Sequence, residues 1–195
     1  TTMGELFDEP PASSGICNPI FEISIRDSDF AEVPRGHEGE IWVRSVAMIS
    51  EYWNRPDANA ECFRDGWFNS GDLGWLDSNN YLYLSGRAKD VIIRGGENVY
   101  PAEIESSFLQ HADIEEAAVF GLDSEAMGEE VAVVVKLTPG SSMGKKDVLD
   151  YARQRLSHYK VPGHVFIADT PLPRTATNKL MRDRIKAEFQ PALAD

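Results

Sequence analysis

The hydrophobic pattern of this 195-residue chain changes within residues 85–101, and that change limits the possible folds more than any other feature. Before it, apolar and polar residues alternate at residues 20–26 and 39–44, the pattern of strands with one buried face. After it, continuous apolar runs at residues 117–120 and 131–135 indicate buried strands. We therefore predict an α+β chain in two lobes that meet in this stretch.

The first lobe, residues 1–88, is predicted to be a small, mostly antiparallel β lobe. Its residues 1–18 are rich in Pro, Ser and Gly and are expected to be a loop or disordered. A short helix is expected at residues 56–63, and a β-hairpin at residues 73–84. The second lobe, residues 89–195, is predicted to be a compact α+β domain.

The first helix of the second lobe is predicted to begin at Pro101, because Pro suits the first position of a helix. Its inner face is expected to carry the apolar side chains of Ile104, Phe108 and Leu109. The remaining elements predicted in this lobe are helices at residues 145–156 and 181–189 and a strand at residues 164–168.

Composition excludes several classes of function. The formal net charge of −13 argues against nonspecific binding to nucleic acid or to an anionic membrane surface, since both require clustered Lys and Arg. No apolar run is long enough for a membrane span. The two cysteines, Cys17 and Cys62, fit no disulfide or metal framework, so we expect a cytoplasmic protein. Because the chain starts with Thr1 instead of Met, we expect a piece of a longer protein.

Two charged residues in the first lobe are candidates for ligand binding. Asp72 follows a glycine at a turn, where its carboxylate can accept hydrogen bonds from the two hydroxyls of a ribose. Alternatively, Asp72 caps the local backbone. Arg87 stands at the end of a predicted strand, where it can contact a phosphate or a ribose or pair with a surface carboxylate.

Further candidate residues lie within residues 85–101 and after them, and the sequence alone does not decide their roles. Gly95-Gly96 is either a hairpin turn or a surface on which a narrow ligand lies against the backbone. Lys89 and Asp90 read by default as a charge pair in a linker. Lys179 ends a polar loop at residues 171–179, where it either approaches a phosphoryl group or is merely solvated.

Six segments, in this order along the chain, resemble motifs of the adenylate-forming superfamily, specifically its AMP-dependent acyl-CoA synthetase branch. The similarity extends over residues 15–189, nearly the whole chain. The segments are residues 39–44, 52–56, 65–74, 86–90, 95–105, and finally 159–162 together with 172–175.

The resemblance implies a ligase that works in two steps. A carboxylic acid reacts with ATP to give an acyl-adenylate and pyrophosphate, and coenzyme A then takes the acyl group as a thioester. It implies ATP, Mg²⁺ and CoA as co-substrates of the complete enzyme, with no tightly bound cofactor in this chain. The first lobe would end the large N-terminal domain, and the second would be the mobile C-terminal domain.

The resemblance also implies roles for individual residues. Lys179 would be the catalytic lysine that approaches the α-phosphate, while Asp72 and Arg87 would bind the nucleotide at its ribose. Lys89 would be the hinge about which the second lobe rotates. Gly95-Gly96 would line the channel for the thiol arm of CoA, and no residue is expected to ligate a metal.

Two departures from the family pattern affect these expectations. Asn178 stands where the family usually has Gly, and Asn tolerates the positive φ that such a loop requires. The Gly/Ser/Thr-rich phosphate loop and the Tyr-Gly-x-Thr-Glu motif do not occur in the 195 residues. We therefore expect no adenylation by this chain alone.

Two other functions remain open from the sequence. One is an adenylation domain that loads the phosphopantetheine of a carrier protein. The other, from a different class, is a non-catalytic module that binds a partner protein.

Overall fold

The computed structural model describes residues 10 and 12–190 and divides the chain into two compact units. The first unit ends at Lys89, and the second begins at Asp90. Both units contain strands and helices, so the predicted α+β class is confirmed. Most of the predicted N-terminal loop, residues 1–9 and 11, lies outside the described residues. The assignment of the units to domains of a larger enzyme stays a prediction.

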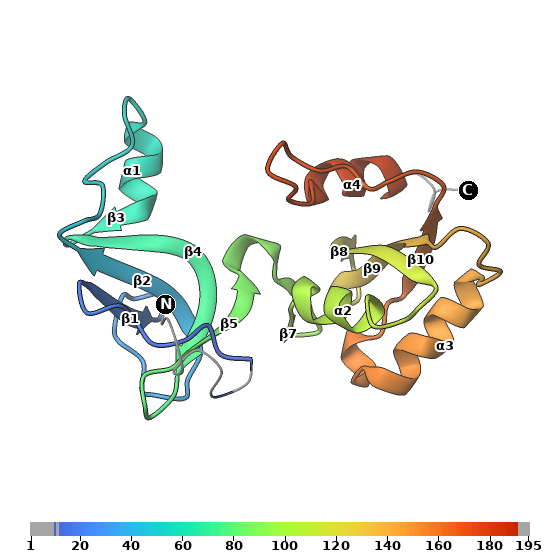
Figure 1. Cartoon of the computed structure of the whole chain (residues 1–195), viewed down its shortest axis with the longest axis horizontal. Helices are drawn as coiled ribbons and strands as arrows, with labels where there is room; N and C mark the ends of the chain where they lie inside the picture. The colour runs from blue at the N-terminus through green and yellow to red at the C-terminus, as the bar shows by residue number, and fades with distance from the viewer. Residues whose placement is uncertain (1–9, 11, 191–195) are drawn as a thin grey trace. The chain divides into compact units, whose positions relative to one another are not determined.

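The first unit is built on a five-stranded antiparallel sheet (Figure 1). Strand β4 lies at its centre, with β2 on one side and β3 and β5 on the other. The two segments that alternate in the sequence pair with each other, because β1 runs antiparallel to β2. The elements are β1 (Phe21–Arg26), β2 (Gly39–Ser45), α1 (Pro56–Cys62), β3 (Phe63–Arg64), β4 (Trp67–Leu76) and β5 (Leu82–Arg87).

The core of the first unit comes from the apolar positions of these alternating strands. One cluster of buried side chains consists of Ile25, Ile41, Leu76 and Leu82. The described part of the N-terminal segment is tied to the same sheet, since Ile16 forms an isolated antiparallel bridge with Tyr81. The linker then passes through a short 3-10 helix, Ala88–Asp90.

The second unit is built on a sheet with strand order β10-β9-β6-β7, in which β8 also pairs with β9. The strands are mostly antiparallel, and β10 alone runs parallel to β9. No helix among the described elements is both long and apolar enough to cross a membrane. The elements are β6 (Ile92–Arg94), β7 (Glu97–Val99), α2 (Pro101–Phe108), β8 (Ile114–Ser124), β9 (Gly128–Leu137), α3 (Lys145–Arg155), a 3-10 helix (His158–Lys160), β10 (His164–Ala168) and α4 (Arg182–Phe189).

Strands β8 and β9 are covered on both faces, with α2 and α3 on one face and α4 on the other (Figure 1). Val119 and Val133 face α2 and α3, while Ala118 and Val134 face the side of α4. Both faces are therefore apolar, which explains why these strands read as continuous apolar runs in the sequence. Ile185, which is fully buried, anchors α4 to its face of the sheet.

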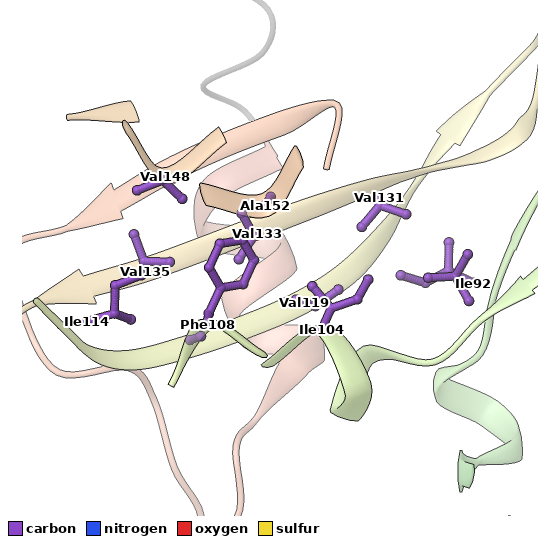
Figure 2. Close-up of a cluster of buried hydrophobic side chains, with 12 residues drawn as sticks. Ile92, Ile104, Phe108, Ile114, Val119, Val131, Val133, Val135, Val148 and Ala152 are labelled. Atoms are coloured by element: carbon purple, nitrogen blue, oxygen red, sulfur yellow. The ribbon is translucent and has the colours of Figure 1, made fainter. Parts of the chain in front are cut away.

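The core under α2 centres on Phe108, whose ring lies among the side chains of two helices and the sheet (Figure 2). Phe108 and Ile104 are fully buried, as the spacing predicted. The prediction for Leu109 was wrong, because its exposed fraction is 51%. The helix ends at Phe108, and Leu109 lies about 100° further around the helix axis, which turns its side chain away from the core.

Candidate functional site

A bulge in β4 sets the position of Asp72. Glu40 and Trp42 of β2 pair with Leu73 and Asn69 of β4. One residue lies between the first two, whereas three residues lie between their partners, so β4 bulges here. The bulged backbone has its own hydrogen bonds. The Gly71 N–H donates to Asn69 Oδ1 at 2.8 Å. A bulge bends the strand and redirects its side chains, and here it redirects the carboxylate of Asp72.

Asp72 and Arg87 lie side by side, because β4 and β5 pair in the register that places them opposite each other. Arg87 Nε is 3.0 Å from Asp72 Oδ1. One third of the Asp72 side chain and nearly half of the Arg87 side chain stay exposed, at 33% and 47%. Both groups therefore keep surface for a ligand while each orients the other.

We expect Gly71→Ala to destabilise the first unit by about 1–2 kcal/mol, since Gly71 has a φ of 74° that an L-residue adopts with strain. Space is not the reason, because the nearest atom to a Cβ at this position would be Arg87 Nη1 at 3.7 Å. Urea unfolding of both variants measures the loss. Gly71→Asn is the matched control, because Asn tolerates positive φ. Equal losses in the two variants would contradict this explanation.

Lys179 lies on a tight hairpin instead of an open loop. The Thr175 N–H donates to the carbonyl oxygen of Lys179 at 2.8 Å, and the Asn178 N–H donates to that of Thr175 at 2.9 Å. Asn178 has a φ of 65°, so it adopts the conformation expected of the residue that replaces Gly. The Lys179 side chain is exposed. The hairpin therefore holds the backbone of Lys179 while its ammonium faces solvent.

One leg of this hairpin is attached to the sheet by Arg174. Its guanidinium pairs with Glu116 of β8 at 3.1 Å and donates to the carbonyl oxygen of Asn178 at 3.0 Å. The Glu116 side chain is only 13% exposed, so the pair is partly shielded from water. A charged hydrogen bond of this kind is stronger than a neutral one, and it makes the hairpin part of the second unit's rigid body.

Lys89 is exposed and is the last residue of the first unit. The default interpretation of Lys89 and Asp90 as a charge pair is not what the structure shows. Asp90 Oδ2 instead pairs with Arg182 Nη1 at 3.1 Å, within the second unit. The change from one unit to the next thus occurs directly after Lys89.

Gly95 and Gly96 form the turn between β6 and β7, with φ values of 59° and 88°. A Cβ atom at residue 95 would lie 2.8 Å from the methyl carbon of Met127, whereas one at residue 96 would meet nothing within 4 Å. The hairpin-turn interpretation is therefore right. It does not exclude a ligand, because both glycines are exposed and Gly96 borders open space.

Lys160, in the segment 159–162, is a second lysine in the second unit with a well-defined environment. Its Nζ lies 2.7 Å from both carboxylate oxygens of Glu103. Burial by itself lowers the pKa of Lys160, but the hydrogen bond and the charge of Glu103 outweigh it and raise this pKa above its ordinary value. Lys160 is thus held by a carboxylate, whereas Lys179 projects into solvent.

Residues 103–179 match the AMP-binding enzyme C-terminal domain, and Lys179 is the last residue of the match. This part of the chain, within the second unit, is therefore similar to the C-terminal domain of AMP-binding enzymes. Most of the chain is also similar to part of several CoA ligases. The predicted resemblance is therefore confirmed.

Two curated members of the family illustrate the similarity. The chain is 44% identical to 2-succinylbenzoate–CoA ligase of Geobacillus kaustophilus over 151 residues, which cover 77% of this chain and 31% of the relative. It is 38% identical to long-chain-fatty-acid–CoA ligase FadD13 of Mycobacterium tuberculosis over 178 residues, or 91% of this chain and 35% of the relative. The chain thus spans about a third of the length of these relatives.

Solved structures of AMP-binding enzymes have the same fold. O-succinylbenzoate CoA synthetase of Bacillus subtilis, in complex with its acyl-adenylate intermediate, superposes with a TM-score of 0.86 at 37% identity, over 93% of this chain and 37% of that one. ATP-bound MatB of Rhodopseudomonas palustris gives a TM-score of 0.84 at 33% identity, over 92% of this chain and 36% of that one.

Proposed function

We propose that this chain forms the C-terminal portion of an ATP-dependent carboxylic acid–CoA ligase. The observation that carries the proposal is Lys179, an exposed ammonium at the end of a hydrogen-bonded hairpin in a domain of the AMP-binding family. Curated relatives at 44% and 38% identity are CoA ligases. Related structures contain ATP or an acyl-adenylate, which supports a nucleotide as the shared ligand.

In the first step, an oxygen of the substrate carboxylate attacks the α-phosphorus of ATP and pyrophosphate leaves. Negative charge builds up on the α-phosphoryl oxygens during this displacement. The Lys179 ammonium stabilises that charge, and the closed hairpin means that little backbone ordering is needed when it does so. Lys179 is therefore the catalytic residue that this chain contributes to adenylation.

The first unit contributes the nucleotide contact. Asp72 accepts hydrogen bonds from the ribose hydroxyls through the exposed part of its carboxylate. Arg87 keeps that carboxylate oriented through the 3.0 Å contact and presents the rest of its guanidinium toward the same ribose. The bulge at Gly71 places this pair at the surface of the sheet, so the ligand does not have to enter the unit's core.

In the second step, the thiol of CoA attacks the carbonyl carbon of the acyl-adenylate, a thioester forms and AMP leaves. The exposed turn at Gly95-Gly96 lets the narrow thiol arm pass close to the backbone. A single domain that serves both steps must present two different faces, so it must rotate. Lys89, directly before the boundary of the units, is the hinge in this proposal.

The metal ion of this reaction is not assigned to residues of this chain. Among the described residues, no group of three or more His, Cys, Asp or Glu side chains is arranged to hold a metal ion. Mg²⁺ binds ATP through phosphate oxygens and usually keeps several water ligands, so it enters as part of the nucleotide substrate.

We expect the 195-residue chain by itself to show no acid-dependent exchange of pyrophosphate into ATP, because the family's phosphate-loop motif is absent from its sequence. A longer protein that contains this chain should show that exchange, and it should form a thioester when CoA is added. Exchange by the chain alone would contradict the assignment of these steps. If the longer protein loaded a carrier protein's phosphopantetheine and left CoA unreacted, the carrier-protein alternative would be correct.

A further inference from the structure

Arg182 binds two carboxylates that are far from it in the sequence. Its Nη1 lies 3.1 Å from Asp90 Oδ2, and its Nη2 lies 2.7 Å from Glu105 Oε2 and 2.9 Å from Oε1. The three side chains are largely buried, at 25% exposed for Arg182, 17% for Asp90 and 11% for Glu105. We call Asp90, Glu105 and Arg182 the arginine bridge.

The bridge is connected to the sheet as well. Glu105 Oε1 accepts the backbone N–H of Val119, in the middle of β8, at 2.9 Å. The carboxylate of Glu105 therefore accepts hydrogen bonds both from a strand amide and from the guanidinium of Arg182. Such charge-assisted, two-pronged contacts with a guanidinium have a defined geometry, which a flexible ammonium does not reproduce.

Two members of the bridge lie next to places that the proposed mechanism uses, and the third lies on α2. Asp90 directly follows the hinge residue Lys89 and opens the second unit. Glu105 belongs to α2. Arg182 is the first residue of α4 and follows the Lys179 hairpin. The bridge thus ties the chain after the hinge to the chain after the catalytic lysine.

Arg182 attaches the second leg of the hairpin, the chain that follows Lys179, to the sheet. Arg174 attaches the first leg, the chain that precedes the turn. Arg174 pairs with Glu116, and Arg182 reaches the same strand through Glu105 and the Val119 amide. The Met181 N–H also donates to the carbonyl oxygen of Pro173 at 2.9 Å, which joins the two legs. Loss of Arg182 would leave the second leg without its own attachment to β8, held only by the Met181–Pro173 hydrogen bond and by the packing of Ile185 further along α4.

We propose that Arg182 is a positioning residue for Lys179, which couples the start of the second unit after the hinge to the catalytic hairpin. The inference rests on the proposed function of Lys179. Because Arg182 contacts Asp90, a rotation of the second unit about Lys89 moves the Lys179 hairpin together with the rest of that unit. Arg182 itself acts through the hairpin and has no contact with the reacting atoms in this proposal.

Hydrogen exchange of the 195-residue chain tests the positioning without any activity. In Arg182→Met, we expect the amides of Thr175, Asn178 and Met181 to exchange at least about tenfold faster, since local opening sets their exchange rate. The amides of β9 should keep their protection. Arg184→Met is the matched control, because Arg184 is an exposed residue of the same helix and the charge change is the same. Unchanged exchange in the hairpin of Arg182→Met would overturn the proposal.

If Arg182→Met fails to fold, Glu105→Gln replaces it in the same experiment. The amide oxygen of Gln can still accept the Val119 N–H, but the charge that binds Arg182 is gone. Faster exchange in the hairpin supports the bridge, and exchange equal to that of the unaltered chain overturns it.

The half-reactions of a longer enzyme that contains this chain test the catalytic consequence. Arg182→Met should slow adenylation by about 10- to 100-fold, the range typical of a small misplacement of a catalytic group, and should spare thioester formation from acyl-adenylate. In a Lys179→Ala background it should cause no further loss. If Arg182→Met slowed both half-reactions equally, and if its loss added to that of Lys179→Ala, Arg182 would have a merely structural role. If the unaltered longer enzyme showed no exchange of pyrophosphate into ATP, the proposed function would be refuted. The hydrogen-exchange experiment on the 195-residue chain would still test the arginine bridge.

Discussion

Lys179→Ala is expected to slow adenylation by about a hundredfold or more, the loss typical when one preorganised contact to developing charge is removed. The reason lies in the hairpin. The hydrogen bond from the Thr175 N–H to the carbonyl oxygen of Lys179 fixes the backbone, so the ammonium alone is lost in the variant. Thioester formation from preformed acyl-adenylate should stay nearly unchanged, since in the proposed mechanism the second unit has rotated by then and presents the face with Gly95-Gly96 instead of Lys179.

The measurement compares the two half-reactions in a longer enzyme that contains this chain. Pyrophosphate exchange reports adenylation, and release of AMP from added acyl-adenylate and CoA reports the second step. Lys146→Ala is the matched control, because Lys146 is an exposed lysine on α3 and its loss changes the net charge equally. A comparable loss in both half-reactions of Lys179→Ala would argue against the assigned role.

Phe108→Ala is expected to lower the free energy of unfolding of the second unit by about 3–5 kcal/mol. Phe108 is fully buried among the valines of β8 and β9 and the apolar face of α3 (Figure 2). The branched side chains on the sheet cannot move into the space that the ring leaves, so a cavity adds to the lost transfer free energy. That loss corresponds to about a 150- to 5,000-fold change in the unfolding equilibrium.

Leu109→Ala provides the matched control, because it removes an aliphatic side chain from the next position, which is 51% exposed. Its effect should stay within about 0.5 kcal/mol, as is usual for surface substitutions. Urea unfolding, followed by circular dichroism, measures both variants. Similar losses in the two would mean that the ring of Phe108 does not form the centre of this core.

The elements of the second unit were largely predictable because their signals are local. The run at residues 131–135 indicated a buried strand, and the structure contains β9 there. The spacing of Ile104 and Phe108 indicated the buried face of α2. Leu109 was assigned wrongly because it directly follows Phe108, and one step along a helix turns the next side chain about 100° away from the buried face.

Part of the candidate site was also predictable, from the order of the motifs. Asp72, Arg87 and Lys179 were named as candidates from their residue types and positions, and the resemblance, which the comparisons confirm, gave them roles that stay predictions. The contact between Asp72 and Arg87 was not predictable in the same way. It depends on the β4–β5 register and on the bulge at Gly71, and a shift of one residue would place the two side chains on opposite faces.

The sequence by itself determined the α+β class, the change of pattern near residue 89 and the resemblance to AMP-binding enzymes, because periodicity and motif order depend on neighbouring residues. Only the tertiary structure decided that Arg182 joins Asp90, 92 positions earlier, to Glu105, 77 positions earlier. The linear sequence contains many acids that a guanidinium can bind. Packing of α2 and α4 against β8 selects two of them, because among residues 10 and 12–190 these two come within hydrogen-bonding distance of Arg182 once the core has closed.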